Sequence, residues 1–157
     1  MNSRTLLSRR AGIPRSSDRG RSRTPSSGKR RLEEYQNPGS LISLDYSNRG
    51  TAFLPNIKQF KNLTEIDLSG NLLKTQVAEL SLLKYLKKVN LSRNDIDCLW
   101  ALPTTLEVLV ISKNRLKALG SNVSRLKKLR YLDMAHNQIE NLEPIVELTS
   151  LRYLKAK

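Results

Sequence analysis

Residues 126–151 read LKKLRYLDMAHNQIENLEPIVELTSL. Within them, Leu132, Asp133 and Met134 alternate between apolar and polar side chains, as residues of a half-buried β-strand do. The L-x-x-L steps on either side are typical of tight turns or short helical arcs. The whole unit has the pattern L-x-x-L-x-L-x-x-N-x-L, with Asn137 at the asparagine position.

This unit recurs along the chain at a nearly constant period. Complete copies begin at Leu63, Leu86, Leu106 and Leu129, a copy with Arg49 in place of the asparagine begins at Leu41, and another copy starts at Leu151. Successive copies are 22, 23, 20, 23 and 22 residues apart. This period and pattern are the signature of leucine-rich repeats. The chain therefore resembles the leucine-rich repeat family, and within it the short intracellular class that includes a nuclear phosphatase regulator and an axonemal dynein light chain.

The resemblance implies an α/β fold in which the chain coils into a solenoid. A curved parallel sheet would line the concave face, and short helices and turns would form the convex face. We place this domain at residues 38–157, with five to six repeats and the last one incomplete, and the turn cluster at residues 37–40 marks its boundary. Two interior columns are expected to fill its core: Leu68, Leu91, Ile111 and Met134, and beside them Ile66, Val89, Leu109 and Leu132.

An asparagine follows the strand in each complete repeat, at Asn71, Asn94, Asn114 and Asn137. After the strand the backbone must turn inside the protein, where its polar groups have no sheet partner. A side-chain amide can donate to and accept from such groups. We therefore predict a structural role for these four residues, not a binding site.

Residues that alternate with the buried positions are expected to point outward from the concave face. One outward column is Ser43, Glu65, Lys88, Val108, Tyr131 and Tyr153, and the next is Asp45, Asp67, Asn90, Val110, Asp133 and Lys155. Exposed aromatic and apolar side chains with a basic rim are typical of protein interfaces. We predict a protein-binding surface formed by Val108, Val110, Tyr131, Tyr153, Arg93, Lys113 and Asp133. The alternative is a plain sheet face whose β-prone residues pack across strands.

The convex arcs between strands differ in length. Residues 75–84 carry apolar side chains at helical spacing, which predicts a short helix, and Pro103 argues against a long helix over residues 97–103. Ser121 is expected to cap a short arc, and Glu143 to open another. Trp100 is expected in the core or half-buried, with a partner anchor as the alternative.

Residues 1–37 form a basic tail rich in Arg, Ser, Gly and Pro. The chain has a formal net charge of +14, and half of it lies in this tail. Such a segment buries too little apolar surface to offset its ordering entropy, so we expect disorder in the free state. Its cations would bind a polyanion such as tubulin or RNA: Arg4, Arg9, Arg10, Arg15, Arg19, Arg21, Arg23, Lys29, Arg30 and Arg31.

Other interpretations of the tail remain open. Residues 1–17 contain no acidic residue and fit a mitochondrial transit peptide. Gly28–Arg31 resembles a nuclear-import patch. A solvated linker without a fixed partner is the remaining alternative. Thr24 and Ser26 lie among arginines, and their phosphorylation would add roughly −1.5 to −2 charges each and release the tail from an anionic partner.

Several kinds of chemistry are not indicated by the sequence. His136 is the single histidine, which excludes a site with several histidine ligands, and no phosphate-binding glycine loop is found. Cys98 is the single cysteine, so no internal disulfide can form, and we expect it on the return side of a repeat. No run of 18 apolar residues and no apolar secretory signal is present. We therefore expect no catalysis, no cofactor, no metal, no small-molecule substrate and no membrane contact.

With the basic tail, the resemblance to the repeat class of an axonemal dynein light chain implies a protein-interaction adaptor in the cytoplasm, on cytoskeletal or ciliary structures. A ribonucleoprotein component with the tail on RNA and a phosphatase regulatory subunit are the alternatives, and the nucleus and the mitochondrion are alternative locations. Leu151 and Leu154 would lie on an open edge strand. Either the chain is a part of a longer one, or a partner caps this edge, or the exposed edge is tolerated.

Overall fold

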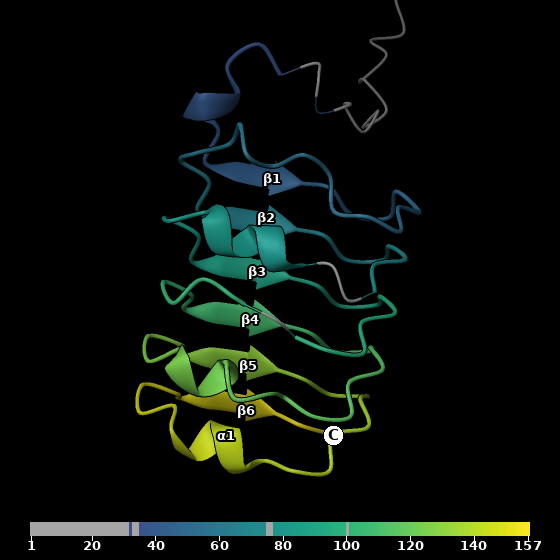
Figure 1. The fold of residues 1–157 in the computed structure, drawn as a ribbon, viewed down its shortest axis with the longest axis vertical. Helices are drawn as coiled ribbons and strands as arrows, with labels where there is room; N and C mark the ends of the chain where they lie inside the picture. Colours follow the sequence, from purple (N-terminus) through teal and green to yellow (C-terminus); the bar gives the residue numbers. More distant parts are fainter. Residues whose placement is uncertain (1–31, 33–34, 75–76, 100) are drawn as a thin grey trace, which may run out of the picture.

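The computed structural model describes residues 32, 35–74, 77–99 and 101–157. In these residues six short strands form one parallel sheet in chain order (Figure 1). The strands are β1 (Ser43–Asp45), β2 (Glu65–Asp67), β3 (Lys88–Asn90), β4 (Val108–Val110), β5 (Tyr131–Asp133) and β6 (Tyr153–Lys155). Each strand pairs with the equivalent three residues of the next repeat, so Leu44 lies opposite Ile66 and Leu109 opposite Leu132. The predicted solenoid and the predicted strand positions are confirmed.

Short helical segments lie outside the sheet, most of them in a second layer against one of its faces (Figure 1). Three are 3₁₀ helices, η2 (Pro38–Ser40), η3 (Ala78–Leu82) and η4 (Val123–Arg125), and one is the α-helix α1 (Glu143–Val146). The helix η3 confirms the one predicted within residues 75–84, and α1 begins at Glu143 as predicted. Residues 97–99 and 101–103 contain no helix, in agreement with the effect expected of Pro103.

The predicted cap at Ser121 is wrong. Asn122 precedes η4, its backbone is already helical (φ −68°, ψ −25°), and its side chain makes no capping hydrogen bond. Instead, the Ser124 hydroxyl donates to the Ser121 carbonyl at 2.7 Å. A capping side chain works from an extended residue, and the backbone of Asn122 is not extended.

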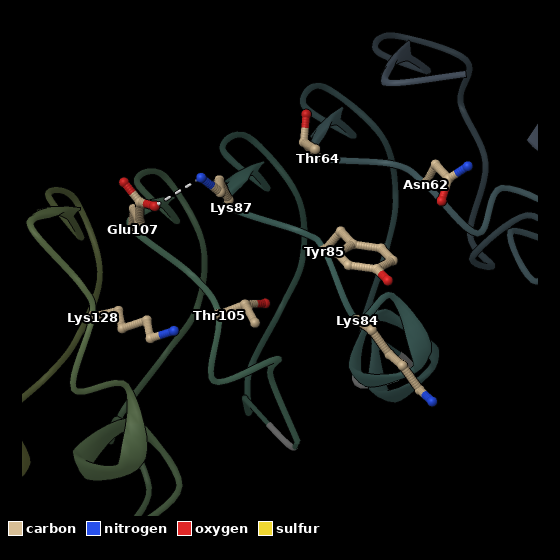
Figure 2. A pocket seen from close by; sticks show the side chains of 8 residues that line it. All are labelled: Asn62, Thr64, Lys84, Tyr85, Lys87, Thr105, Glu107 and Lys128. Carbon is tan, nitrogen blue, oxygen red and sulfur yellow. Dashed lines mark ion pairs between the residues drawn. The ribbon is translucent and has the colours of Figure 1, made fainter. Parts of the chain in front are cut away.

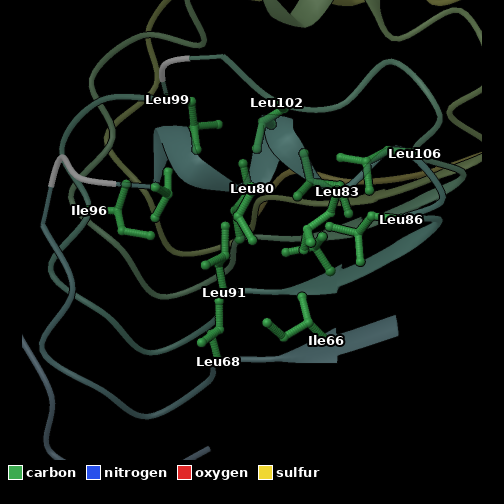
Figure 3. Close-up of a cluster of buried hydrophobic side chains, with 14 of the residues drawn as sticks. Ile66, Leu68, Leu80, Leu83, Leu86, Leu91, Ile96, Leu99, Leu102 and Leu106 are labelled. Atoms are coloured by element: carbon green, nitrogen blue, oxygen red, sulfur yellow. The ribbon is translucent and has the colours of Figure 1, made fainter. Parts of the chain in front are cut away.

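The hydrophobic core lies between the sheet and the helical layer (Figure 3). The two predicted interior columns are buried throughout, with no member more than 3% exposed. Leu80 of η3 and Leu83 close the core from the convex side. Each such side chain stabilises the fold by roughly 1.5–3 kcal/mol. A single repeat could not enclose these side chains, so the stability comes from stacking.

The asparagine column joins each repeat to the one before it. The Asn94 amide donates to Leu91 O of its own repeat and to Leu68 O of the preceding repeat, both at 3.0 Å, and its Oδ1 accepts from Leu73 N at 3.1 Å. Asn71, Asn114 and Asn137 repeat this arrangement at equivalent positions. The predicted structural role is confirmed.

Two residues of the predicted tail pack on the repeat domain. Leu32 is buried at 6% exposure, and the ring of Tyr35 meets Phe60 edge-on with 5.7 Å between ring centroids. The first repeat has no preceding repeat to cover it, and these side chains cover part of that end. The packed region therefore includes residues upstream of the boundary expected at Pro38. The predictions made for residues 1–31 and for Trp100 lie outside the described residues.

We predict that Asn94→Ala lowers the free energy of unfolding by about 1–3 kcal/mol, because three buried backbone groups lose their partner. Chemical denaturation of both proteins measures this difference. Asn62→Ala is the matched control, because Asn62 is exposed and donates one hydrogen bond, to Gly39 O at 2.7 Å. The control should lose less than about 1 kcal/mol. Equal losses in the two variants would contradict the buried role of Asn94.

Candidate functional site

The concave face carries an aromatic row, which we define as Val108, Tyr131 and Tyr153. The sheet register places Val108 opposite Tyr131, and Tyr131 opposite Tyr153. Tyr131 is 36% exposed and Tyr153 67% exposed, and their ring centroids are 6.3 Å apart. Val108 is half-buried. Large aromatic side chains are thus presented side by side on a rigid sheet, as the sequence predicted.

The second outward column has a structural task that the sequence analysis missed. The side-chain oxygens of Asp45, Asp67, Asn90 and Asp133 each accept the N–H of the residue two positions on, at 2.8–3.1 Å. Asp133 is consequently buried at 8% exposure, although we predicted it as an exposed binding residue. Its other oxygen lies 3.9 Å from Lys155 Nζ. Aspartate and asparagine favour this local bond after a strand.

The concave face changes in charge along the solenoid. Strands β1 and β2 present Asp45, Glu65 and Asp67, around a groove of about 410 Å³ that reaches Val108 and Val110 on β4. Lys88 Nζ lies 2.7 Å from Glu65 Oε1 at the middle of this groove. The hydrogen bond and charge of Glu65 raise the pKa of Lys88 above its ordinary 10.5. The concave face thus changes from acidic at β1 and β2 to apolar and aromatic from β4 onward.

Arg93, Lys113 and His136 form an exposed basic edge at the ends of the strands. They adopt the left-handed backbone conformation, with φ of 56°, 56° and 57°. The turn requires it, because the N–H of Arg93 donates to Ser112 O and that of Lys113 to Ala135 O, at 2.9 and 2.8 Å. Asn48 and Gly70 occupy the same position in earlier repeats. For a residue with a Cβ, this conformation has a steric cost of about 1–2 kcal/mol.

We predict that Lys113→Gly raises the free energy of unfolding by about 0.5–1 kcal/mol, because glycine adopts positive φ without steric strain. Lys117→Gly is the control, since Lys117 is exposed and is not among the residues with positive φ. The control should leave stability unchanged or lower it slightly. Thermal and chemical unfolding of the three proteins test this, and a loss of stability in Lys113→Gly would contradict the strain.

A second hollow lies at the opposite edge of the sheet, where the chain enters the strands (Figure 2). Thr64, Lys87 and Glu107 directly precede β2, β3 and β4 and line it, as does Tyr85, which is 60% exposed. Its volume is about 330 Å³. The sequence analysis did not single out these residues. The sequence signal for this region was the cluster of lysines in the segments that lead into β2 and β3, at Lys58, Lys61, Lys84 and Lys87.

The remaining predicted features lie elsewhere. The tail cations, Thr24 and Ser26 fall outside the described residues. Cys98 is a free, half-buried thiol in the return segment. The described part of the chain holds no group of three His, Cys, Asp or Glu residues arranged to bind a metal. None of its helices has the length and apolarity needed to cross a membrane.

Comparison with known proteins gives the following. A family model for leucine-rich repeats matches residues 104–147. A protein phosphatase 1 regulatory inhibitor subunit homologue of Arabidopsis thaliana is 32% identical over 126 residues, covering 76% of this chain and 38% of that protein. Opticin of Bos taurus is 38% identical over 102 residues, covering 60% of this chain and 32% of that protein. The chain thus spans about a third of the length of these relatives.

Solved structures share the fold. A leucine-rich repeat protein of Leptospira interrogans superposes with a TM-score of 0.69 and 32% identity, covering 82% of this chain and 34% of that one. Internalin C2 of Listeria monocytogenes superposes with a TM-score of 0.69 and 21% identity, covering 75% of this chain and 52% of that one.

Proposed function

The chain is a leucine-rich repeat protein, and we propose that it is a non-catalytic adaptor whose concave sheet binds a protein partner. Proteins of this fold generally serve as protein-interaction modules. The observation that carries the proposal for this face is the pairing of Tyr131 and Tyr153, exposed side by side with ring centroids 6.3 Å apart. Exposed tyrosines on a rigid surface are frequent anchors of protein interfaces.

The surroundings of the aromatic row describe the partner. Arg93 and Lys113 are exposed at one border of the sheet, and Lys155 lies beside the row. Asp45, Glu65 and Asp67 occupy the other end of the concave face. A complementary partner would place an apolar side chain on the tyrosines, carboxylates towards Arg93 and Lys113, and a basic group towards β1 and β2.

We predict that the double variant Tyr131→Ala, Tyr153→Ala loses concave-face partners by at least about tenfold, because anchor residues contribute about 2 kcal/mol or more each. Quantitative mass spectrometry of proteins captured by the full chain and by the variant measures this. Phe53→Ala is the matched control, since Phe53 is 67% exposed, as Tyr153 is, but lies outside the six strands. Circular dichroism verifies that both variants are folded. Retention of every partner by the double variant would rule out this face as the interface.

The basic tail supports a second part of the proposal, in which the tail anchors the chain to an anionic assembly. Ten Lys and Arg residues lie in the segment from Arg4 to Arg31, and a cationic segment is attracted to polyanions. We propose a microtubule or axonemal structure in the cytoplasm as the assembly, with RNA as the alternative. Phosphorylation at Thr24 and Ser26 would weaken the contact by adding negative charge.

We predict that the full chain co-sediments with microtubules at low salt and is released as salt rises, since its contacts are screened. A full-length variant with the ten tail cations replaced by glutamine should remain in the supernatant. A variant with Glu at Thr24 and Ser26 should be released at lower salt. Crosslinking to RNA over the same salt series is the competing measurement. Strong RNA crosslinking without co-sedimentation would transfer the proposal to the ribonucleoprotein alternative.

Phosphatase regulation is a second candidate, favoured by one observation. The relative from Arabidopsis thaliana, a phosphatase 1 regulatory inhibitor subunit homologue, matches 76% of this chain. The concave face would then hold the phosphatase as its protein partner. The test is inhibition of purified protein phosphatase 1. Inhibition by the full chain that is lost in the Tyr131→Ala, Tyr153→Ala variant would favour the phosphatase as the partner.

A further inference from the structure

The hollow at the entering edge of the sheet continues into a neighbouring one. The two share Asn62, Lys84 and Tyr85, and have volumes of about 330 and 530 Å³. We call them together the flank groove. Asn62 and Tyr85 each lie three residues before a strand, as do Thr105 and Lys128, so successive repeats supply its lining (Figure 2). The groove lies at the entering edge of the sheet, whereas the aromatic row lies on its concave face.

The flank groove carries a net positive charge. Lys58, Lys61, Lys84 and Lys128 line it, all are exposed, and none of them makes an ion pair within the described part of the chain. The fifth lysine, Lys87, lies 3.3 Å from Glu107, the one carboxylate among the lining residues. An anionic ligand would therefore meet several uncompensated ammonium groups from adjacent repeats.

The groove is also partly apolar. Leu82 is 54% exposed and Tyr85 is 60% exposed, and both line the larger hollow above the buried Leu83. The polar lining residues are already engaged: Asn62 donates to Gly39 O at 2.7 Å, Thr64 to Ile42 O at 3.2 Å and Thr105 to Leu86 O at 2.7 Å. These bonds hold the walls in place. The surface available to a ligand is thus an apolar patch, formed by Leu82 and Tyr85, surrounded by lysines.

We propose that the flank groove binds an acidic protein segment, which places an apolar side chain between Leu82 and Tyr85 and carboxylates on the surrounding lysines. Charge complementarity selects an anionic occupant. Two observations favour a peptide over a nucleic acid. Among the described residues a single aromatic ring, that of Tyr85, lines the groove, whereas single strands stack successive bases on several rings. Glu107 would also face a continuous phosphate backbone, whereas a peptide can vary its side chains there.

The proposal makes the chain a two-site adaptor. The tail of this chain is itself strongly basic and would be repelled by the groove, so the acidic segment belongs to another protein. The groove and the aromatic row are built from different residues.

Binding of a fluorescein-labelled peptide tests the proposal, with a single phenylalanine flanked on both sides by glutamates. Fluorescence anisotropy with the full chain is compared with Lys84→Glu, Lys128→Glu and with Tyr85→Ala. The double charge reversal should weaken binding about tenfold, and Tyr85→Ala about fivefold. A peptide with alanine in place of the phenylalanine should bind more weakly to the wild-type chain but be insensitive to Tyr85→Ala.

Matched controls separate this groove from the other anionic and concave sites. Lys117→Glu changes the charge equally at an exposed position outside the groove, and Tyr153→Ala removes an exposed tyrosine of the aromatic row. Both should bind the peptide as the wild type does, even where Tyr153→Ala loses the concave-face partner. A photo-crosslinking version of the peptide should label residues around Tyr85 and Lys84.

Three results would overturn the proposal. The groove variants could bind the peptide as tightly as the wild-type chain does. The crosslinks could fall only in residues 1–31, which would assign the binding to the tail. A labelled oligouridylate could lose affinity in the groove variants while the peptide does not, which would make the groove a nucleic-acid site.

Discussion

One asparagine side chain in each complete repeat bonds the backbone of the repeat before it, and the rest of the molecule depends on this link. The Asn114 amide, for example, joins Leu91 O to Ile111 O, and its oxygen accepts from Ile96 N. The bonds satisfy polar groups at the point where the chain leaves the sheet and enters the core. They also fix each strand against its neighbour. Because the register is fixed, equivalent outward positions fall into straight columns, and residues far apart in the sequence become a surface.

The two candidate surfaces arise from this register in different ways. On the concave face, strand alternation directs Tyr131 and Tyr153 outward, and stacking brings their rings together. At the entering edge, the residues three positions before each strand are stacked, and Tyr85 lines the same groove as lysines of other repeats. The concave face is acidic at one end and aromatic at the other, whereas the flank groove is basic and contains the apolar patch of Leu82 and Tyr85. Both surfaces suit a ligand with an apolar side chain and carboxylates, and the acidic residues of β1 and β2 additionally favour a basic group in the ligand of the concave face.

The strands, the interior columns and the asparagine role could be predicted because each follows from a short repeating pattern. The period of the leucines defines which positions are buried, and alternation then defines which face outward. Asp133 was misjudged because alternation gives the direction of a side chain but not its local bonding, and its carboxylate turns back to Ala135 N. Tyr85 and its lysines escaped notice because the arcs vary in length, so their neighbours depend on the three-dimensional path. The packing of Leu32 on the first repeat had no repeating pattern to reveal it.

The left-handed turn after each strand limits how this protein can vary. At the position of Arg93, Lys113 and His136 the backbone tolerates glycine, asparagine or an unbranched side chain, whereas valine, isoleucine or threonine would clash with the chain. Substitutions among these tolerated residues can change the charge of the basic edge while the path of the backbone stays constant. Substitutions in this basic edge could therefore change ligand preference during evolution while the fold stays the same.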